Sequence, residues 1–278
     1  MIQTFLRGAV LFAAAMLAGC ASFTTTEGGV PIDASHTATG QDSRVLFLVL
    51  HYTVADFPGS MKILTEQQVS SHYLLSDGSP PRIYRLVDEN RRAWHSGASG
   101  WKENRRLNSS SIGIEIVHPG FVPGPADEQD SQRTFVPFPP AQIDALVPLI
   151  QDIARRHQIL PERILGHGEV TPSYKVDPGP TFPWKRLSEL GITPPWPDAA
   201  RVAEQRALFD AALPDITWFQ KTLARHGYPI EVTGQMDKQT QRVLMNFQMR
   251  YRPEKYDGQP DAESAALLDV LTRAANPQ

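Results

Sequence analysis

The fold is set by residues 44–53, which read Arg-Val-Leu-Phe-Leu-Val-Leu-His-Tyr-Thr. Residues 44–50 are mostly β-branched or large and apolar, which is typical of a buried strand. The strand ends in His51, and ligands gather at the carboxyl ends of strands in α/β sheets. We therefore expect an α/β domain whose functional site includes the edge at which His51 lies.

Strand and helix patterns alternate along the chain after this run. Short apolar runs predict strands, two of which are joined through a turn at Asp77-Gly78 as a β-hairpin. Apolar residues at helical spacing predict a helix over residues 142–158. Strands that alternate with helices indicate an α/β domain at residues 44–195. The predicted strands after the first cover residues 71–75, 82–87, 111–117 and 163–165.

A different pattern follows the break Pro194-Pro195-Trp196-Pro197. Beyond it, apolar residues recur at helical spacing, and the connections hold glycine. We expect a small three-helix domain near residues 205–275, and the break suggests that it folds as an independent unit. Its helices are predicted at residues 216–226, 237–251 and 262–274.

Composition argues against nucleic acid as a partner and leaves other substrates open. The chain has 278 residues, of which 41% are apolar, which is enough for one large domain or for a medium and a small one. Its net charge of −3 provides no basic face for phosphate groups. Cys20 is the only cysteine, so the sequence has no pair for a disulfide.

The first residues have the features of a targeting signal. Arg7 precedes an apolar run, residues 9–18, that is too short to span a bilayer comfortably. Leu17-Ala18-Gly19-Cys20 resembles a bacterial lipobox, in which the cysteine is lipidated. The alternative is an ordinary secretory signal with a chance cysteine. We expect a signal peptide at residues 1–19, a lipidated Cys20, and a flexible tether over residues 20–43 that is rich in Thr, Gly and Ser.

The residues after the cysteine predict where such a lipoprotein resides. Ala21 and Ser22 lack the aspartate that, by the sorting rule of these lipoproteins, retains them in the inner membrane. The resemblance therefore implies an outer-membrane lipoprotein that faces the periplasm, held by an N-terminal lipid anchor.

Three residues from separate segments have the side chains of a zinc site. His51 ends the first strand, His167 lies in Gly-His-Gly-Glu, and Asp177 lies in Lys-Val-Asp-Pro-Gly-Pro. Two imidazoles and a carboxylate are a ligand set of catalytic zinc, which keeps a fourth position for water. Singly, each has a plainer interpretation: a structural histidine, a loop histidine, and an aspartate that begins a turn. Their combination with Glu115 and Lys175 favours a metallohydrolase.

Glu115 and Lys175 are the candidates for the remaining chemistry. A period of two along residues 111–117 places Glu115 on the opposite face from the isoleucines, where a carboxylate needs a partner or a task. It could take a proton from the attacking water and give it to the leaving amine. Lys175 could stabilise the negative oxygen of the tetrahedral state. The alternatives are a solvent-facing glutamate on an edge strand and a solvated loop lysine.

Several segments match one family in identity and order. They are residues 49–53, 69–74, 93–97, 108, 111–115, 166–167 and 175–180. Over residues 44–190 the chain thus resembles the zinc-dependent N-acetylmuramoyl-L-alanine amidases of the amidase-2 type. The resemblance implies a mixed β-sheet flanked by helices, zinc ligands at His51, His167 and Asp177, and catalytic roles for Glu115 and Lys175.

The matching segments also supply candidate substrate-binding residues, namely Trp94, His95 and Asn108. Trp94 could pack against sugar, although a core position is slightly favoured for it. His95 is expected to line the cleft and donate to the substrate, and not to bind the metal.

The C-terminal helices resemble the small peptidoglycan-binding domain that is fused to many cell-wall hydrolases. The matching pieces include Phe219-Gln220, His226-Gly227-Tyr228, Phe247-Gln248 and Asp257-Gly258. Their apolar residues are expected to be core residues first, and wall binding is what the resemblance implies.

The sequence therefore predicts an enzyme that uses zinc to hydrolyse the amide between the lactyl group of N-acetylmuramic acid and L-alanine, in peptidoglycan or muropeptides. One alternative is a non-catalytic peptidoglycan-binding lipoprotein, which the complete set of five chemical residues disfavours. The other is an amidase restricted to the recycling of anhydro-muropeptides, which the lipobox and the C-terminal helices disfavour.

Overall fold

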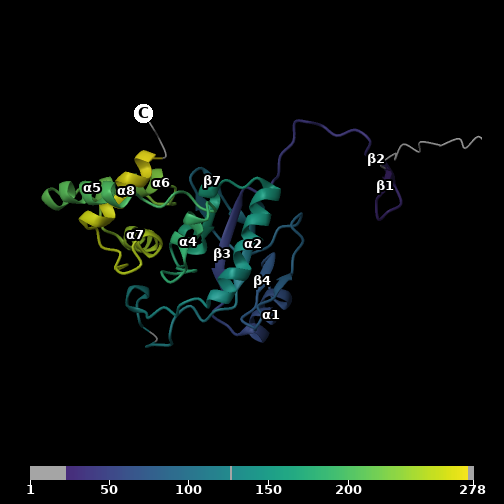
Figure 1. The fold of residues 1–278 in the computed structure, drawn as a ribbon, viewed down its shortest axis with the longest axis horizontal. Helices are drawn as coiled ribbons and strands as arrows, with labels where there is room; N and C mark the ends of the chain where they lie inside the picture. The colour runs from purple at the N-terminus through teal and green to yellow at the C-terminus, as the bar shows by residue number, and fades with distance from the viewer. Residues whose placement is uncertain (1–22, 126, 275–278) are drawn as a thin grey trace, which may run out of the picture. The chain divides into compact units, whose positions relative to one another are not determined.

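The computed structural model describes residues 23–125 and 127–274 (Figure 1). The chain divides into two compact units, residues 1–42 and residues 43–278. In the first unit β1 (Phe23–Thr25) pairs antiparallel with β2 (Pro31–Asp33), and residues 24–42 are all exposed. The predicted signal peptide and Cys20 lie outside the described residues. Among those described, no helix combines the length and apolar character of a membrane span.

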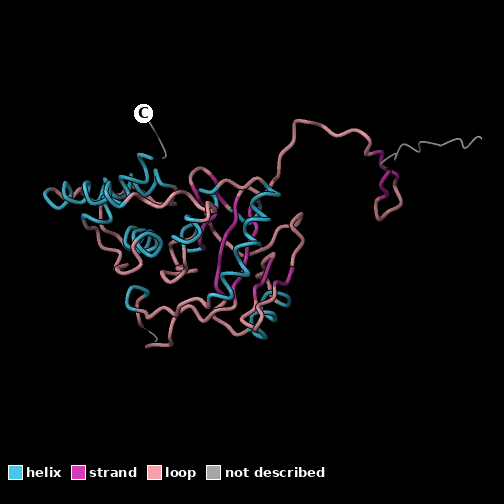
Figure 2. The backbone as a smooth tube through the Cα atoms, in the orientation of Figure 1, coloured by secondary structure: helices cyan, strands magenta, loops and turns pink. Residues whose placement is uncertain are grey.

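A five-stranded mixed sheet forms the centre of the second unit (Figures 1 and 2). The strand order is β5-β4-β8-β3-β9, and all neighbours pair parallel except β4 and β5, which form the predicted hairpin. A mixed sheet flanked by helices confirms the expected fold class. The strands span Phe47–Tyr52 (β3), Tyr73–Leu75 (β4), Ile83–Arg85 (β5), Ser111–Ile116 (β8) and Ile164–Gly166 (β9).

Alternation along the central strands separates two hydrophobic cores. Even-numbered residues such as Leu48 and Ile114 pack in one buried cluster with the apolar stripe of α2 (Pro140–His157), which is the predicted helix and lies alongside β3 in Figure 1. β3 and β8 are parallel neighbours, and their register places His51 directly beside Glu115. Both are at odd-numbered positions, so they lie on the sheet face that α2 does not cover.

Four helices follow the proline-rich break as far as residue 274, where the described chain ends, one more than the sequence predicts. The three expected helices are α6 (Ile216–His226), α7 (Lys238–Tyr251) and α8 (Ala262–Ala274), and α5 (Ala199–Ala211) precedes them. No residue of α5 is fully buried, and its sequence accordingly lacks the strong apolar stripe from which a helix can be predicted. Aspartate side chains cap the first three of these helices by accepting backbone N–H groups, at Asp198, Asp215 and Asp237.

These helices share a core with the sheet. Phe47 and Val49, at odd-numbered positions of β3, belong to the same buried cluster as Phe219 of α6 and Phe247 of α7. Residues 43–278 accordingly form one compact unit. Removing the helices would expose apolar residues of the sheet, and independent folding of the C-terminal region stays an untested prediction. The sequence boundaries at 44–195 and 205–275 remain a prediction.

Shorter elements complete the second unit. The helices are α1 (Phe57–Glu66), α3 (His167–Val170) and α4 (Trp184–Glu189), and β6 (Gly100–Trp101) pairs with β7 (Asn104–Arg105). Single 3₁₀ turns lie at Leu107–Ser109, Asp130–Gln132 and Pro161–Arg163.

Phe247→Ala tests the shared core. Phe247 is 0% exposed, and such a truncation should lower the free energy of unfolding by about 3–5 kcal/mol. Because β3 packs in the same cluster, the amide protons of residues 47–52 should also exchange faster with solvent. Urea unfolding and hydrogen–deuterium exchange of the full chain measure the two effects.

Phe209→Ala is the matched control. Phe209 lies on α5 at the margin of the cluster and is only partly buried. It should destabilise the protein less and leave exchange at β3 nearly unchanged. Unchanged β3 exchange in Phe247→Ala would contradict a shared core and favour an independent helical domain.

Candidate metal centre and active site

His51 is held by a buried central strand of the sheet. It lies on β3, which is buried at every residue between β8 and β9, and the side chain is 1% exposed. His167 begins α3 directly after the edge strand β9. Asp177 follows on an irregular segment, and its C=O accepts from the N–H of Gly168 over 2.8 Å. This bond ties the backbone next to His167 to that of Asp177.

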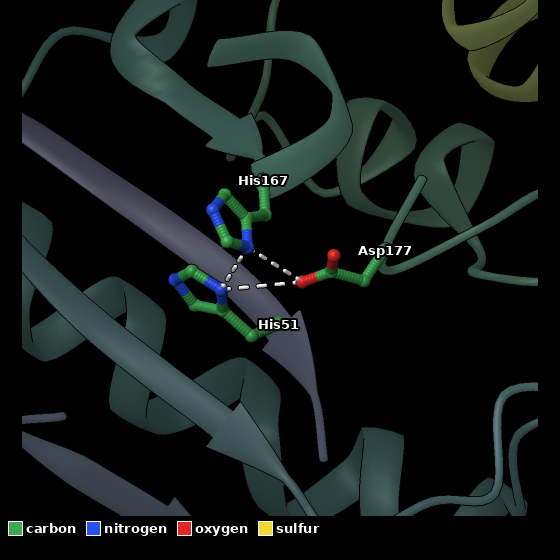
Figure 3. A group of neighbouring side chains, drawn as sticks. All are labelled: His51, His167 and Asp177. Carbon is green, nitrogen blue, oxygen red and sulfur yellow. Dashed lines mark hydrogen bonds and ion pairs between the residues drawn. The ribbon is translucent and has the colours of Figure 1, made fainter. Parts of the chain in front are cut away.

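The three side chains converge (Figure 3). His51 Nδ1 and His167 Nδ1 are 2.9 Å apart, and Asp177 Oδ2 lies 3.2 Å from the first and 3.1 Å from the second. Donors at zinc bond lengths in a tetrahedral site are about 3.3 Å from one another. Two imidazoles and a carboxylate at these separations fit a zinc ion, and the sequence prediction of which residues meet is supported by the geometry.

A chain of hydrogen bonds behind His51 fixes its tautomer. Ser111 Oγ donates to the carbonyl of Leu107 over 2.6 Å, so it must accept from His95 Nε2, 3.1 Å away. His95 Nδ1 then accepts from His51 Nε2 over 3.0 Å, which leaves the lone pair of His51 on Nδ1, facing the cluster. Partners of this kind orient metal-binding imidazoles. Sequence reasoning missed Ser111, whose role depends on tertiary contacts.

The protonation states suit metal binding. Burial and the charge of His167 lower the pKa of His51 to about 4, and burial lowers the pKa of His95. Burial alone would raise the pKa of Asp177, but His167 and His51 outweigh it and hold this pKa below its usual range. A neutral imidazole and an ionised carboxylate are the forms that bind zinc.

Glu115 is placed to exchange protons beside the cluster. Its Oε1 is 3.9 Å from His51 Nδ1, and its Oε2 is buried with no hydrogen-bond partner among the described residues. Burial, assisted by Asp177, raises the pKa of Glu115 to about 8, while Lys175 acts to lower it. β8 is an internal strand, so the alternative of a solvent-facing glutamate on an edge strand does not hold. A buried, unpartnered carboxylate oxygen in this position favours a chemical role.

A cleft of about 350 Å³ opens over these groups. Glu115, His167, Lys175 and Asp177 all line it, and His51 lies against the last of these through its Nδ1. The structure therefore brings the five predicted chemical residues together. Sequence reasoning missed several other lining residues, which stand outside the motifs it used; they include Phe121, Asp130, Arg133 and Tyr174.

The three candidate substrate-binding residues are placed differently. Trp94 is 50% exposed and lines the cleft, so the core position favoured for it is wrong. His95 also lines the cleft, although both ring nitrogens are engaged within the protein. Asn108 is not among the lining residues, and its Oδ1 accepts from the backbone N–H groups of His95 and Ser96 at 3.1 and 2.8 Å. It supports the loop that carries His95, and a substrate contact from Asn108 stays an untested prediction.

Comparison with known proteins gives a consistent result along the chain. Residues 41–180 match the family described as N-acetylmuramoyl-L-alanine amidase, and residues 213–268 match one described as a putative peptidoglycan binding domain. The chain is 41% identical to N-acetylmuramoyl-L-alanine amidase AmiD of Escherichia coli (strain K12) over 267 residues, which cover 93% of this chain and 94% of AmiD.

Solved structures agree with this similarity. The E. coli AmiD complex aligns with a TM-score of 0.76 at 38% identity, covering 91% of this chain and 98% of AmiD. AmpDh3 from Pseudomonas aeruginosa aligns with a TM-score of 0.78 at 37% identity, covering 90% of this chain and 99% of AmpDh3. With the amidase match spanning the segments that carry the converging side chains, the chain belongs to the amidase-2 family of N-acetylmuramoyl-L-alanine amidases.

Proposed function

We propose that this chain hydrolyses the amide bond between the lactyl group of N-acetylmuramic acid and L-alanine, using zinc held by His51, His167 and Asp177. The observation that carries the proposal is the convergence of three donor atoms beside the unpartnered carboxylate of Glu115 in one cleft. Amide hydrolysis needs an activated water, an acceptor for its proton and a donor for the leaving amine.

The substrate is proposed from the relatives. E. coli AmiD is described in complex with the substrate anhydro-N-acetylmuramic acid-L-Ala-D-gamma-Glu-L-Lys, and AmpDh3 in complex with anhydromuramic pentapeptide. These complexes support muropeptides, including anhydro-muropeptides, as substrates of this chain. The cleft is open and lined by both aromatic and charged side chains, which suits a ligand that combines a sugar with a peptide.

Zinc bound to the three donors would polarise the scissile carbonyl and lower the pKa of a water molecule. Glu115 Oε2, which is free to form hydrogen bonds, accepts the proton of the attacking water and passes it to the departing amine of L-alanine. A cation on the three donors would also counter the raised pKa of Glu115 and favour the ionised form that acts as a base.

Lys175 is proposed to stabilise the developing negative charge on the carbonyl oxygen. It is partly buried and lines the same cleft, and its charge acts on both Glu115 and His51. A fixed cation aimed at the place where charge develops is worth more in a water-poor site than in bulk solvent.

We also propose that the protein is an outer-membrane lipoprotein facing the periplasm, with acyl chains on Cys20, and that residues 205–275 contact peptidoglycan. The lipobox and the family match at residues 213–268 support these two statements. The exposed residues 24–42 supply a linker between an anchored cysteine and the second unit.

Hydrolysis should require both metal and Glu115. An anhydro-muropeptide carrying a stem peptide should yield the free sugar and a peptide that begins with L-alanine, as detected by mass spectrometry. A chelator should abolish this reaction and added zinc restore it. Glu115→Gln should keep the zinc and lose about 10²–10⁴-fold in turnover, because it keeps the shape of the base but cannot accept the proton.

Glu204→Gln, on the exposed surface of α5, is the control and should behave as wild type. Turnover by metal-free protein would contradict the zinc proposal, and undiminished turnover in Glu115→Gln would contradict the choice of base. The same assay on intact sacculi separates a general amidase from one restricted to anhydro-muropeptides.

His95→Ala should weaken zinc binding although His95 is not a ligand. It removes the acceptor that holds His51 in the tautomer with a free Nδ1 lone pair, and such losses typically cost about 10–100-fold in metal affinity. His167→Ala, which removes a direct donor, should lose zinc altogether. Competition with a chromophoric chelator measures both, and His36→Ala, an exposed histidine of the first unit, is the control. Unaltered affinity in His95→Ala would show that the hydrogen-bond chain does not control His51.

Cys20→Ala should release the protein from the membrane fraction without harming the purified enzyme. Stable anchoring takes two or more acyl chains, and Cys20 is the single cysteine in the sequence. Cell fractionation with immunodetection, followed by the muropeptide assay, tests both halves. A variant that stays in the outer-membrane fraction would mean that affinity for the wall, and not lipid, holds the protein there.

A further inference from the structure

One side of α7 contacts the segment that carries two of the zinc donors. Arg242, Asn246 and Arg250 are spaced four residues apart, so they form a single stripe along the helix. All three side chains donate hydrogen bonds to residues within 164–177. The stripe belongs to the region that matches a peptidoglycan binding domain, whereas the segment belongs to the region that matches an amidase.

Asn246 contacts the middle of this segment. Its Nδ2 donates to the carbonyl of Lys175 over 3.1 Å and to that of Arg242, one turn earlier, over 3.0 Å. A Cβ on Gly168 would collide with Asn246 Oδ1, so the absence of a side chain there permits the close approach. The buried carboxamide thus lies between a residue adjacent to His167 and a residue two positions before Asp177.

The two arginines hold the segment on either side of this contact. Arg250 Nη1 donates to Glu169 Oε2 over 2.6 Å, and both side chains are 5% exposed. The same oxygen accepts from the N–H of Gly166 over 2.8 Å, so Arg250 is linked through Glu169 to the residue that precedes α3. Arg242 Nε donates to the carbonyl of Pro172 over 2.9 Å.

The segment needs such support. α3 has only four residues, which is too short for a helix to be stable alone, and residues 171–177 form neither helix nor strand. Nevertheless His167 Nδ1 and Asp177 Oδ2 must remain close, as at the observed 3.1 Å, for both to reach one metal ion. Metal sites lose affinity when the surroundings of their ligands are loose.

We propose that Arg242, Asn246 and Arg250 are positioning residues that hold His167 and Asp177 at zinc-binding distance. The inference rests on the proposed zinc site and goes beyond it, because it makes α7 a structural part of the metal centre. The helical region then acts on the chemistry itself, in addition to any contact with peptidoglycan.

Asn246→Ala and Gln248→Ala form a matched pair of variants. Both residues are buried amides on α7, at 4% and 0% exposure. Gln248, however, bonds within the helical region: its Nε2 donates to the carbonyl of Gln259, and its Oε1 accepts from the N–H of Gly258. The two variants therefore separate the contact with the zinc segment from the general stability of the helices.

The measurements are the zinc dissociation constant of the full chain, by chelator competition, and urea unfolding of the metal-free protein. We expect Asn246→Ala to bind zinc about 10–100-fold more weakly, and Gln248→Ala to bind it as wild type does, even where both lose similar stability. At saturating zinc, Asn246→Ala should still have a lower kcat, because the segment that carries His167 and Asp177 has lost its support. Its KM should be unchanged, because Asn246 does not line the cleft.

Wild-type zinc affinity in Asn246→Ala would overturn the inference, and so would an equal loss in Gln248→Ala, which would trace the effect to general stability. A wild-type chain that binds no zinc would instead overturn the zinc proposal, and this inference with it. The wild-type measurement and the comparison between variants thus distinguish the two failures.

Arg242→Ala carries the same test should Asn246→Ala fail to fold, since the Arg242 side chain is 18% exposed and its loss is better tolerated. Arg242 also pairs with Asp130 at 3.0 Å. Because Asp130 lines the cleft, the control is instead Arg206→Ala: Arg206 lies on α5 and pairs with Glu263 of α8, inside the helical region. Weaker zinc binding in Arg242→Ala alone supports the inference, and equal behaviour of the two variants overturns it.

Discussion

The centre of this protein depends on one geometric constraint, which is that three donor atoms from separate segments lie 2.9–3.2 Å apart. Each segment meets it with different means. His51 stands on an internal strand with hydrogen-bonded neighbours on both sides, whereas His167 follows an edge strand and Asp177 stands in irregular chain. The number of strands that pair with each segment falls in that order. Further contacts hold the donors in place. They come from His95 and Ser111 behind His51, and from α7 behind His167 and Asp177.

Alternation of side chains along β3 and β8 decides which residues lie on the same face as this site. Even-numbered residues of β3 and β8 pack with α2, and odd-numbered residues of β3 pack with the C-terminal helices before the same face reaches His51. His51 and Glu115 therefore share one side of the sheet with Phe219 and Phe247, while Met245 and Met249 of α7 belong to the cluster on the α2 side. A slip of one residue along β3 would turn His51 into the opposite core.

Local patterns were enough to predict the strands, the helix α2 and the five candidate chemical residues, and the family resemblance implied the mixed sheet. The apolar run that ends in His51 is a local signal, and the identity of the motifs around Glu115, His167 and Asp177 ties them to one family. The exposure of a side chain depends on the folded chain and not on its neighbours in sequence. Trp94 was therefore expected in the core, whereas it lies at the cleft. α5 escaped prediction because none of its residues is fully buried and its apolar stripe is weak.

The domain division at the proline-rich break stays a prediction, because that break is only a local signal. It marks a change of local structure, but whether two regions share a core depends on which surfaces meet, and this is not written in either region alone. The hydrogen-bond chain through Ser111 was missed likewise, because Ser111 is 16 positions away from His95 and becomes its partner only in the folded chain. Lipidation and location concern residues outside the described part and remain predictions.

The packing of α7 against the zinc segment has a thermodynamic consequence that runs in both directions. Coupling between two equilibria is reciprocal, so helices that raise the affinity for zinc must themselves be made more stable by zinc, and by the same factor. Metal occupancy and the order of the C-terminal region would then rise and fall together. A newly folded chain would reach its final rigidity only on meeting zinc, and scarcity of the ion would loosen distant helices as well as the chemical centre.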